Sequence, residues 1–128
     1  MRQQIRAFKA LADESRLRVL NLLLDGECCA CEVMQALDVS QSKASRDLGA
    51  LRDAGFLKTR REGLWCIYSL DHDGMGEDMA ALVEVVRRSL AGNAEALADR
   101  ERRRTATRMG VRELCARRRA GRPGQRGA

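Results

Sequence analysis

The fold is decided by residues 37–70, which read LDVSQSKASRDLGALRDAGFLKTRREGLWCIYSL. Apolar side chains recur every three or four residues from Ala44 to Ala54, which predicts a helix with one buried face. Ser40 is suited to cap the amino end of this helix. From residue 56 the apolar period changes to two, so residues 56–70 predict a β-hairpin around a turn at 61–63.

Three shorter helical patterns precede this stretch. Residues 5–12 and 17–24 each show a helical apolar period, and Asp13 can cap the second helix. A third helix is predicted at 31–37, and residues 38–40 connect it to the next. Two short helices joined by a three-residue turn and followed by a basic hairpin form the winged helix-turn-helix arrangement. The predicted fold class is therefore mainly α with a β-hairpin.

A last apolar stripe, between residues 75 and 90, predicts a terminal helix that needs a partner. It can pack on the chain's own first helix, on the same helix of a second copy, or on both, and the last arrangement fits a homodimer formed through terminal helices. The expected dimer contacts are Phe8, Met79, Leu82, Val83, Val86 and Leu90.

Length and charge divide the chain into two parts. A chain of 128 residues has room for one domain, which we place at 1–100. Residues 101–128 hold ten arginines against two glutamates, or +8, whereas the whole chain carries +6. We expect this part to be a flexible tail that is either merely solvated or attracted to polyanions. The longest apolar stretch is far below the roughly 18 residues needed to span a bilayer, so we expect a cytoplasmic protein without a membrane partner.

The polar residues of the fourth helix and the hairpin are suited to double-stranded DNA. Gln41 fits adenine, and Lys43 and Arg46 can neutralise phosphate or read guanine. Singly, each residue also fits an ordinary solvated surface, but their order along helix, turn, helix and basic hairpin favours DNA binding. The predicted DNA-binding residues are Ser40, Gln41, Ser42, Lys43, Ser45, Arg46, Lys58, Arg60 and Arg61.

Catalysis has little support in the sequence. With His72 as the only histidine, no nucleophilic triad can be assembled, and no phosphate-cradling glycine loop is present. We therefore expect no enzyme activity and no required cofactor.

Three of the five cysteines, Cys28, Cys29 and Cys31, lie within four residues. In a reducing compartment such a cluster favours soft-metal binding or redox chemistry over structural disulfides. Three thiolates satisfy trivalent arsenic or antimony, whereas zinc and cadmium generally take four ligands. Cys66 is expected to be a buried core residue, because it lies on a predicted strand between apolar neighbours.

Three segments, DESRLRVLNLL at 13–23, GECCACEV at 26–33 and residues 37–57, resemble the ArsR/SmtB family of metal-responsive repressors. The resemblance runs from about Phe8 to Leu70. It implies a homodimeric winged-helix repressor that binds an inverted repeat in DNA, and it implies that Cys29 and Cys31 form the family's arsenic-binding C-x-C pair.

Two positions depart from the family pattern. Asp47 stands where the family commonly has histidine, which places a carboxylate near DNA; either a nearby arginine such as Arg46 holds it away from phosphate, or it alters operator preference. Met34 stands where the family has a third cysteine. Cys28 is the nearest candidate for the third sulfur and Cys115 the next, and binding by two thiolates stays open.

The sequence thus predicts a repressor that releases its operator when As(III) or Sb(III), as inducer, binds the cysteines. Four alternatives stay open: a disulfide-forming redox sensor, a sensor of cadmium, lead or mercury, a constitutive DNA-binding protein, and a metal chaperone without an operator.

Overall fold

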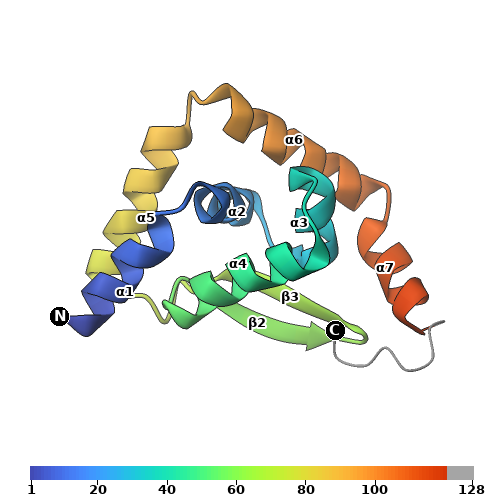
Figure 1. Ribbon diagram of the computed structural model, residues 1–128, viewed down its shortest axis with the longest axis horizontal. Coiled ribbons are helices and arrows are strands. Elements are labelled where there is room, and N and C mark those ends of the chain that lie inside the picture. The colour runs from blue at the N-terminus through green and yellow to red at the C-terminus, as the bar shows by residue number, and fades with distance from the viewer. Residues whose placement is uncertain (121–128) are drawn as a thin grey trace.

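The computed structural model describes residues 1–120 and consists of seven helices and three short strands within that range (Figure 1). In chain order these are α1 (Arg2–Leu11), α2 (Glu14–Asp25), β1 (Cys28–Cys29), α3 (Ala30–Leu37), α4 (Gln41–Asp53), β2 (Leu57–Glu62), β3 (Trp65–Leu70), α5 (Glu77–Leu90), α6 (Ala94–Arg108) and α7 (Val111–Ala120).

The two predicted helix caps are confirmed. The Asp13 carboxylate accepts a hydrogen bond from the Arg16 backbone N–H, and the Ser40 hydroxyl accepts one from Lys43 N–H. Each cap satisfies a donor that the first turn of a helix leaves without a partner. The left-handed conformation of Asp38, with φ of 54°, ends α3 and turns the chain toward α4.

The predicted hairpin is also confirmed, and it belongs to an antiparallel sheet with the order β1-β3-β2. In the hairpin, Leu57 lies opposite Leu70 and Glu62 opposite Trp65. The additional strand β1 pairs Cys28 with Tyr68. Its two residues pair with positions 67 and 68, far along the chain. Such a short strand leaves no local pattern, so β1 was not predicted from the sequence.

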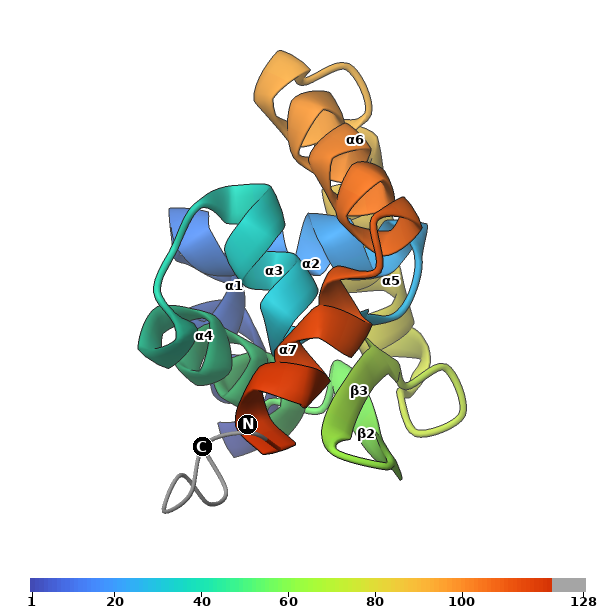
Figure 2. The same ribbon diagram turned by 90° about the vertical axis from the view of Figure 1, so that its right-hand side faces the viewer.

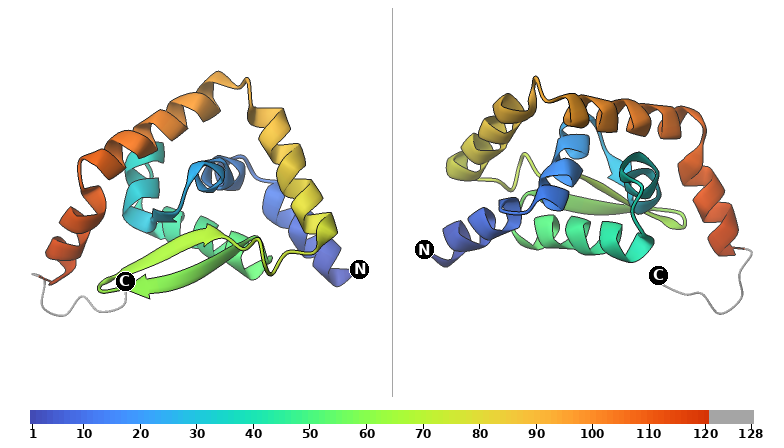
Figure 3. Two further views of the ribbon diagram at one scale, coloured as in Figure 1. Left: turned by 180° about the vertical axis from the view of Figure 1, so that it is seen from behind. Right: turned by 45° about the horizontal axis from the view of Figure 1, so that its top comes forward.

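The core surrounds α2, which lies in the middle of the molecule (Figure 1). Leu20 and Leu22 of α2, Leu48 and Leu51 of α4, and Phe56 are fully buried there. Helices α1 and α5 lie together at one end of the molecule, while α3 and α7 lie at the other (Figure 3). No helix within residues 1–120 is both long and apolar enough to cross a membrane.

Of the residues expected to form a flexible tail, 101–108 lie in α6 and 111–120 in α7. The expected boundary at residue 100 falls inside α6. Residues 121–128 of that expected tail lie outside the described residues. The arginines of α6 dock on a polar face of α2: the carboxylate of Asp25 accepts hydrogen bonds from Arg103 at 3.1 Å and Arg104 at 2.8 Å. Asp99, fully buried on α6, pairs with Arg18 at 2.9 Å. Ion pairs therefore hold α6 in place, because the apolar face of this helix is small.

Candidate functional site

Helices α3 and α4, with the hairpin beside them, form the surface expected to meet DNA (Figure 1). The predicted contact residues Ser40, Ser42, Ser45 and Arg46 are exposed, and Gln41 and Lys43 are half-buried. The opposite face of α4 is held in the core through its apolar residues. The amino end of α4 thus presents polar side chains to solvent on a fixed helix.

Asp47 faces α2 and not the DNA-binding surface. It is 3% exposed, and its carboxylate accepts hydrogen bonds from the Ser15 hydroxyl at 2.5 Å and from Lys43 Nζ at 3.4 Å. Its partners are a serine of α2 and a lysine one turn earlier, and not an arginine, which the sequence suggested as one possibility. The carboxylate therefore fixes α4 against α2 and takes up part of the charge of Lys43.

The predicted hairpin residues Lys58, Arg60 and Arg61 are all exposed on β2. The Arg60 guanidinium donates hydrogen bonds to Glu27 at 3.0 Å and to Glu62 at 2.8 Å. The hydrogen bond from Arg60 lowers the pKa of Glu27 below its usual value. Part of the positive charge of Arg60 is therefore already compensated, which leaves Lys58 and Arg61 as the stronger candidates for phosphate.

The expected dimer residues divide into two groups. Met79, Val83 and Val86 are buried within the protomer, and Leu82 and Leu90 are half-buried there. Phe8 is 58% exposed, together with two residues that sequence analysis did not name, Ile5 on α1 at 45% and Val85 on α5 at 60%. Val85 lies beside the apolar stripe of α5, so an apolar face wider than the buried stripe was the sequence signal that could have identified it.

The neighbouring cysteines of β1 belong to different clusters. Successive side chains of a strand point to opposite faces. Cys28 is fully buried in the main core, and Cys29 belongs to a second buried cluster with Cys31 and Ile67. Trp65 of β3 and Val111 and Cys115 of α7 pack against this second cluster. The structure thus brings Cys29, Cys31 and Cys115 together and separates them from Cys28; Cys66 is half-buried against the main core.

The thiols differ in acidity because their surroundings differ. Burial raises the pKa of Cys28 to about 12. The hydrogen bond from the Cys31 thiol lowers the pKa of Cys29 to about 7, and Cys31, which keeps that proton, has a raised pKa. Cys29 is also the N-cap residue of α3, where the helix dipole favours a thiolate.

Glu32 links the cysteine cluster to both C-terminal helices. Its fully buried carboxylate accepts hydrogen bonds from Cys29 N–H at 3.0 Å, Thr107 Oγ1 at 2.6 Å and Arg112 at 2.8 Å. Burial raises the pKa of Glu32, but these hydrogen bonds outweigh burial and leave it below its usual value. The start of α3 is therefore tied to α6 and α7.

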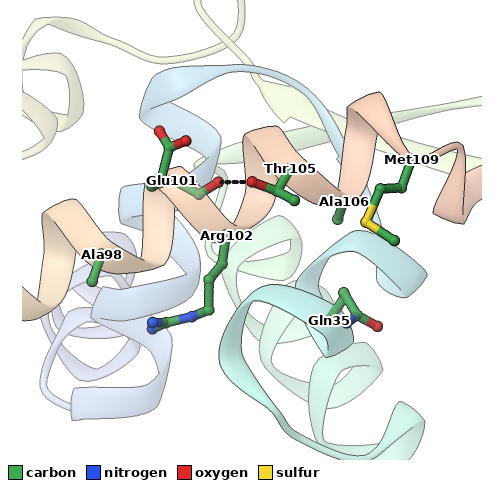
Figure 4. Close-up of a pocket in the computed structure, with 7 residues that line it drawn as sticks. All are labelled: Gln35, Ala98, Glu101, Arg102, Thr105, Ala106 and Met109. Carbon is green, nitrogen blue, oxygen red and sulfur yellow. Dashed lines mark hydrogen bonds between the residues drawn. The ribbon is translucent and has the colours of Figure 1, made fainter.

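Within residues 1–120, no three Cys, His, Asp or Glu side chains are arranged to hold a metal ion as they stand. Any ion bound by the cysteines must draw them closer. A groove of about 350 Å³ lies elsewhere, between α3 and α6 (Figure 4), and none of its lining residues belongs to the cysteine cluster. It is lined by Gln35, Ala98, Glu101, Arg102, Thr105, Ala106 and Met109.

Residues 13–59 match the model of the family described as bacterial regulatory protein, arsR family. Two similar proteins are arsenic resistance transcriptional regulators of Pseudomonas putida. One is 50% identical over 64 residues, which are 49% of this chain and 50% of that protein. The other is 42% identical over 93 residues, 72% of this chain and 77% of that protein. The chain thus spans only about half the length of the first of these relatives.

A similar solved structure is the homodimeric winged helix-turn-helix DNA-binding domain of a possible ArsR-family regulator from Mycobacterium bovis. It is 34% identical, covers 72% of this chain and 82% of that one, and superposes with a TM-score of 0.59. The predicted winged helix-turn-helix fold is therefore confirmed. The curated relatives are regulators, which agrees with the expectation that the chain is not an enzyme.

Proposed function

Because the chain belongs to the arsR family of bacterial regulatory proteins, we propose that it is a homodimeric repressor that binds operator DNA and releases it when As(III) or Sb(III) binds its cysteine cluster. The observation that carries this proposal is the position of Cys29, which is at once a member of the thiol cluster and the N-cap of α3, the first helix of the DNA-binding pair.

DNA binding is supported by the exposed polar amino end of α4 and the basic hairpin. In a winged helix-turn-helix protein the second helix of the pair enters the major groove. Arg46 is exposed on that helix, and its Nε donates only to the Ser42 carbonyl at 3.3 Å, a weak contact that phosphate or a guanine edge can replace.

A homodimer is supported by the exposed apolar residues Ile5, Phe8 and Val85 at the end of the molecule formed by α1 and α5. Covering them with the same surface of a second copy removes them from water and gives a twofold arrangement. The two α4 helices of such a dimer would meet two half-sites of an inverted repeat.

Metalloid binding is supported by the chemistry and number of the clustered thiols. We propose that Cys29 and Cys31 supply two thiolates and Cys115 the third, since α7 already packs Cys115 against them. Cys28 is the alternative third ligand, but its side chain would have to leave the main core. Three sulfurs around the ion suit As(III) and Sb(III) better than the four-coordinate metals.

The same contacts would couple metalloid binding to DNA binding. Drawing the three sulfurs together pulls on the first turn of α3, whose N-cap is Cys29, and on Glu32 beside it. Because α3 packs against α4, this movement would shift α4 in each protomer. The two α4 helices of the dimer would then no longer fit both half-sites at once. Couplings of this kind are typically about 1–3 kcal/mol, or roughly 5- to 150-fold in DNA affinity.

The DNA-binding half of the proposal is tested by fluorescence anisotropy on DNA from immediately upstream of the gene. R46A is expected to weaken binding by about tenfold or more, because each protomer of the dimer loses a base-reading or phosphate contact. R108A is the matched control, because Arg108 is 65% exposed on α6, away from α4 and from the proposed dimer surface. Unchanged affinity of R46A would contradict the placement of α4 on DNA.

The sensing half is tested with C29S/C31S, which is expected to keep operator affinity and to lose release by arsenite. C66S is its control, since Cys66 lies outside the thiol cluster, and it is expected to respond like the wild type. Normal release by C29S/C31S would refute the assigned site.

A redox sensor is the second candidate, favoured by the packing of Cys115 against the cluster that contains Cys31. Peroxide would join Cys31 and Cys115 in a disulfide, taking two electrons and two protons and being reduced to water. Release of operator by peroxide, but not by arsenite, would favour this candidate.

A further inference from the structure

Helix α7 lies directly beside the wing, the hairpin formed by β2 and β3. Its residues Val111 and Cys115 pack against the same cluster as Trp65, the first residue of β3 after the hairpin turn. Arg112 approaches Glu27 at 3.9 Å, and Glu27 in turn pairs with Arg60 of β2. The first half of α7 is therefore anchored to the wing side of the protein.

From this anchor, α7 runs away from α6 toward the DNA-binding side. Its carboxyl end reaches the level of α4 and the hairpin tip, at the end of the molecule opposite α1 and α5 (Figures 1 and 2). A helix rises 1.5 Å per residue, so residues 117–119 lie about 3–6 Å beyond Cys115 along the axis. In a dimer formed through α1 and α5, these two ends would lie over the outer flanks of the DNA site.

The end of α7 is strongly basic. Arg117, Arg118 and Arg119 are consecutive, and no acidic residue follows Glu113 in the sequence. The Arg117 side chain is 76% exposed and its ion pair, at 3.5 Å, is with Glu113 one turn earlier. An exposed pair of this kind contributes little to stability, so phosphate can replace it.

We propose that the carboxyl end of α7 is a third DNA-binding element, which contacts backbone phosphates outside the segment covered by α4 and the wing. This inference rests on the proposed DNA binding. Phosphate contacts position a protein without reading sequence. The arginines therefore add affinity and salt dependence equally for operator and unrelated flanking sequence.

The test measures operator affinity by anisotropy at several salt concentrations for the wild type and for R117A/R118A/R119A. Each lost phosphate contact lowers the slope of log affinity against log salt by about 0.9. Because the dimer carries each arginine twice, the triple variant is expected to lose about 5 from this slope on a duplex with long flanks. On a duplex trimmed to the segment under α4 and the wing it is expected to equal the wild type.

The control R108A removes one exposed charge from α6, where Arg108 is 65% exposed and pairs with Glu101 at 3.3 Å, much as Arg117 pairs with Glu113. Its slope is expected to match the wild type. Trp65 fluorescence reports whether α7 stays docked. Should the triple variant undock α7, R117A alone is expected to lower the slope by about 1.8, since the dimer carries Arg117 twice.

An unchanged slope in both α7 variants, or an equal loss in the control, would overturn the inference while leaving the repressor proposal intact. A wild-type protein that binds no duplex would instead overturn the proposed function.

Discussion

Replacing Asp47 by alanine is expected to lower the free energy of unfolding by about 2 kcal/mol. The carboxylate is 3% exposed and accepts a hydrogen bond from Ser15 at 2.5 Å, and a hydrogen bond to a charged group contributes about 1.5–3 kcal/mol. The contact from Lys43, itself partly exposed, adds at most about 0.5 kcal/mol. Because Ser15 is only half-buried, water can replace part of its lost hydrogen bonding. The expected loss in the free energy of unfolding therefore lies in the lower half of the range of about 1.5–3 kcal/mol.

Urea unfolding followed by circular dichroism measures this change, with the midpoint and the m-value fitted together. D47N keeps an acceptor for Ser15 but loses the charge, so its loss is expected to be smaller than that of D47A. D53A is the matched control on α4, since Asp53 is 70% exposed beside Arg52, and it is expected to change stability by less than about 0.5 kcal/mol.

Operator affinity of folded D47A is expected to equal or slightly exceed that of the wild type, because Asp47 faces α2 and its loss frees Lys43 for phosphate. A D47A protein as stable as the wild type, or a D53A protein equally destabilised, would refute the role of Asp47 in holding α4 against α2.

Three further predictions concern the cysteines and the docking of α6. C115S is expected to weaken arsenite binding by about tenfold or more while keeping operator affinity, measured by Trp65 fluorescence and anisotropy; equal arsenite affinity would remove Cys115 from the site. C28S is expected to be destabilised by about 1–3 kcal/mol in urea, because a hydroxyl replaces a thiol in the main core, yet to bind arsenite normally; lost arsenite binding in a folded C28S would make Cys28 a ligand. Hydrogen bonds from Arg104 and Arg103 lower the pKa of Asp25 below its ordinary value of 3.8, so its contribution to stability is present above that value and is lost as the pH falls through the lower folded pKa. D25N should therefore be less stable than the wild type at pH 7 and approach it in acid, and a difference that stays constant with pH would count against this ion pair.

The local parts of the fold were predictable from the sequence because their signals lie within a few residues. The caps at Asp13 and Ser40, the apolar period of α4 and the change of period at Phe56 each report one element. The docking of α6 was not predictable in this way, since its arginines are paired by acidic residues nearly eighty positions earlier, such as Asp25. An arginine-rich segment reads as a tail until its partners are known.

The candidate site was predictable only in part for the same reason. Cys29 and Cys31 stand out by spacing, but strand β1, which turns Cys28 into the main core, exists only through pairing with Tyr68 and Ile67. The contribution of Glu32 as a link among α3, α6 and α7 depends on Thr107 and Arg112, whose positions no local pattern gives.

The central claim is the coupling of thiol chemistry to DNA binding, and titration of the reduced protein bound to its upstream DNA tests it most directly. Anisotropy is followed at fixed salt as arsenite, antimonite, cadmium or zinc is added. The proposed function predicts release of DNA by arsenite and antimonite at concentrations where zinc has no effect. Specific DNA binding that neither arsenite nor antimonite disturbs would contradict it.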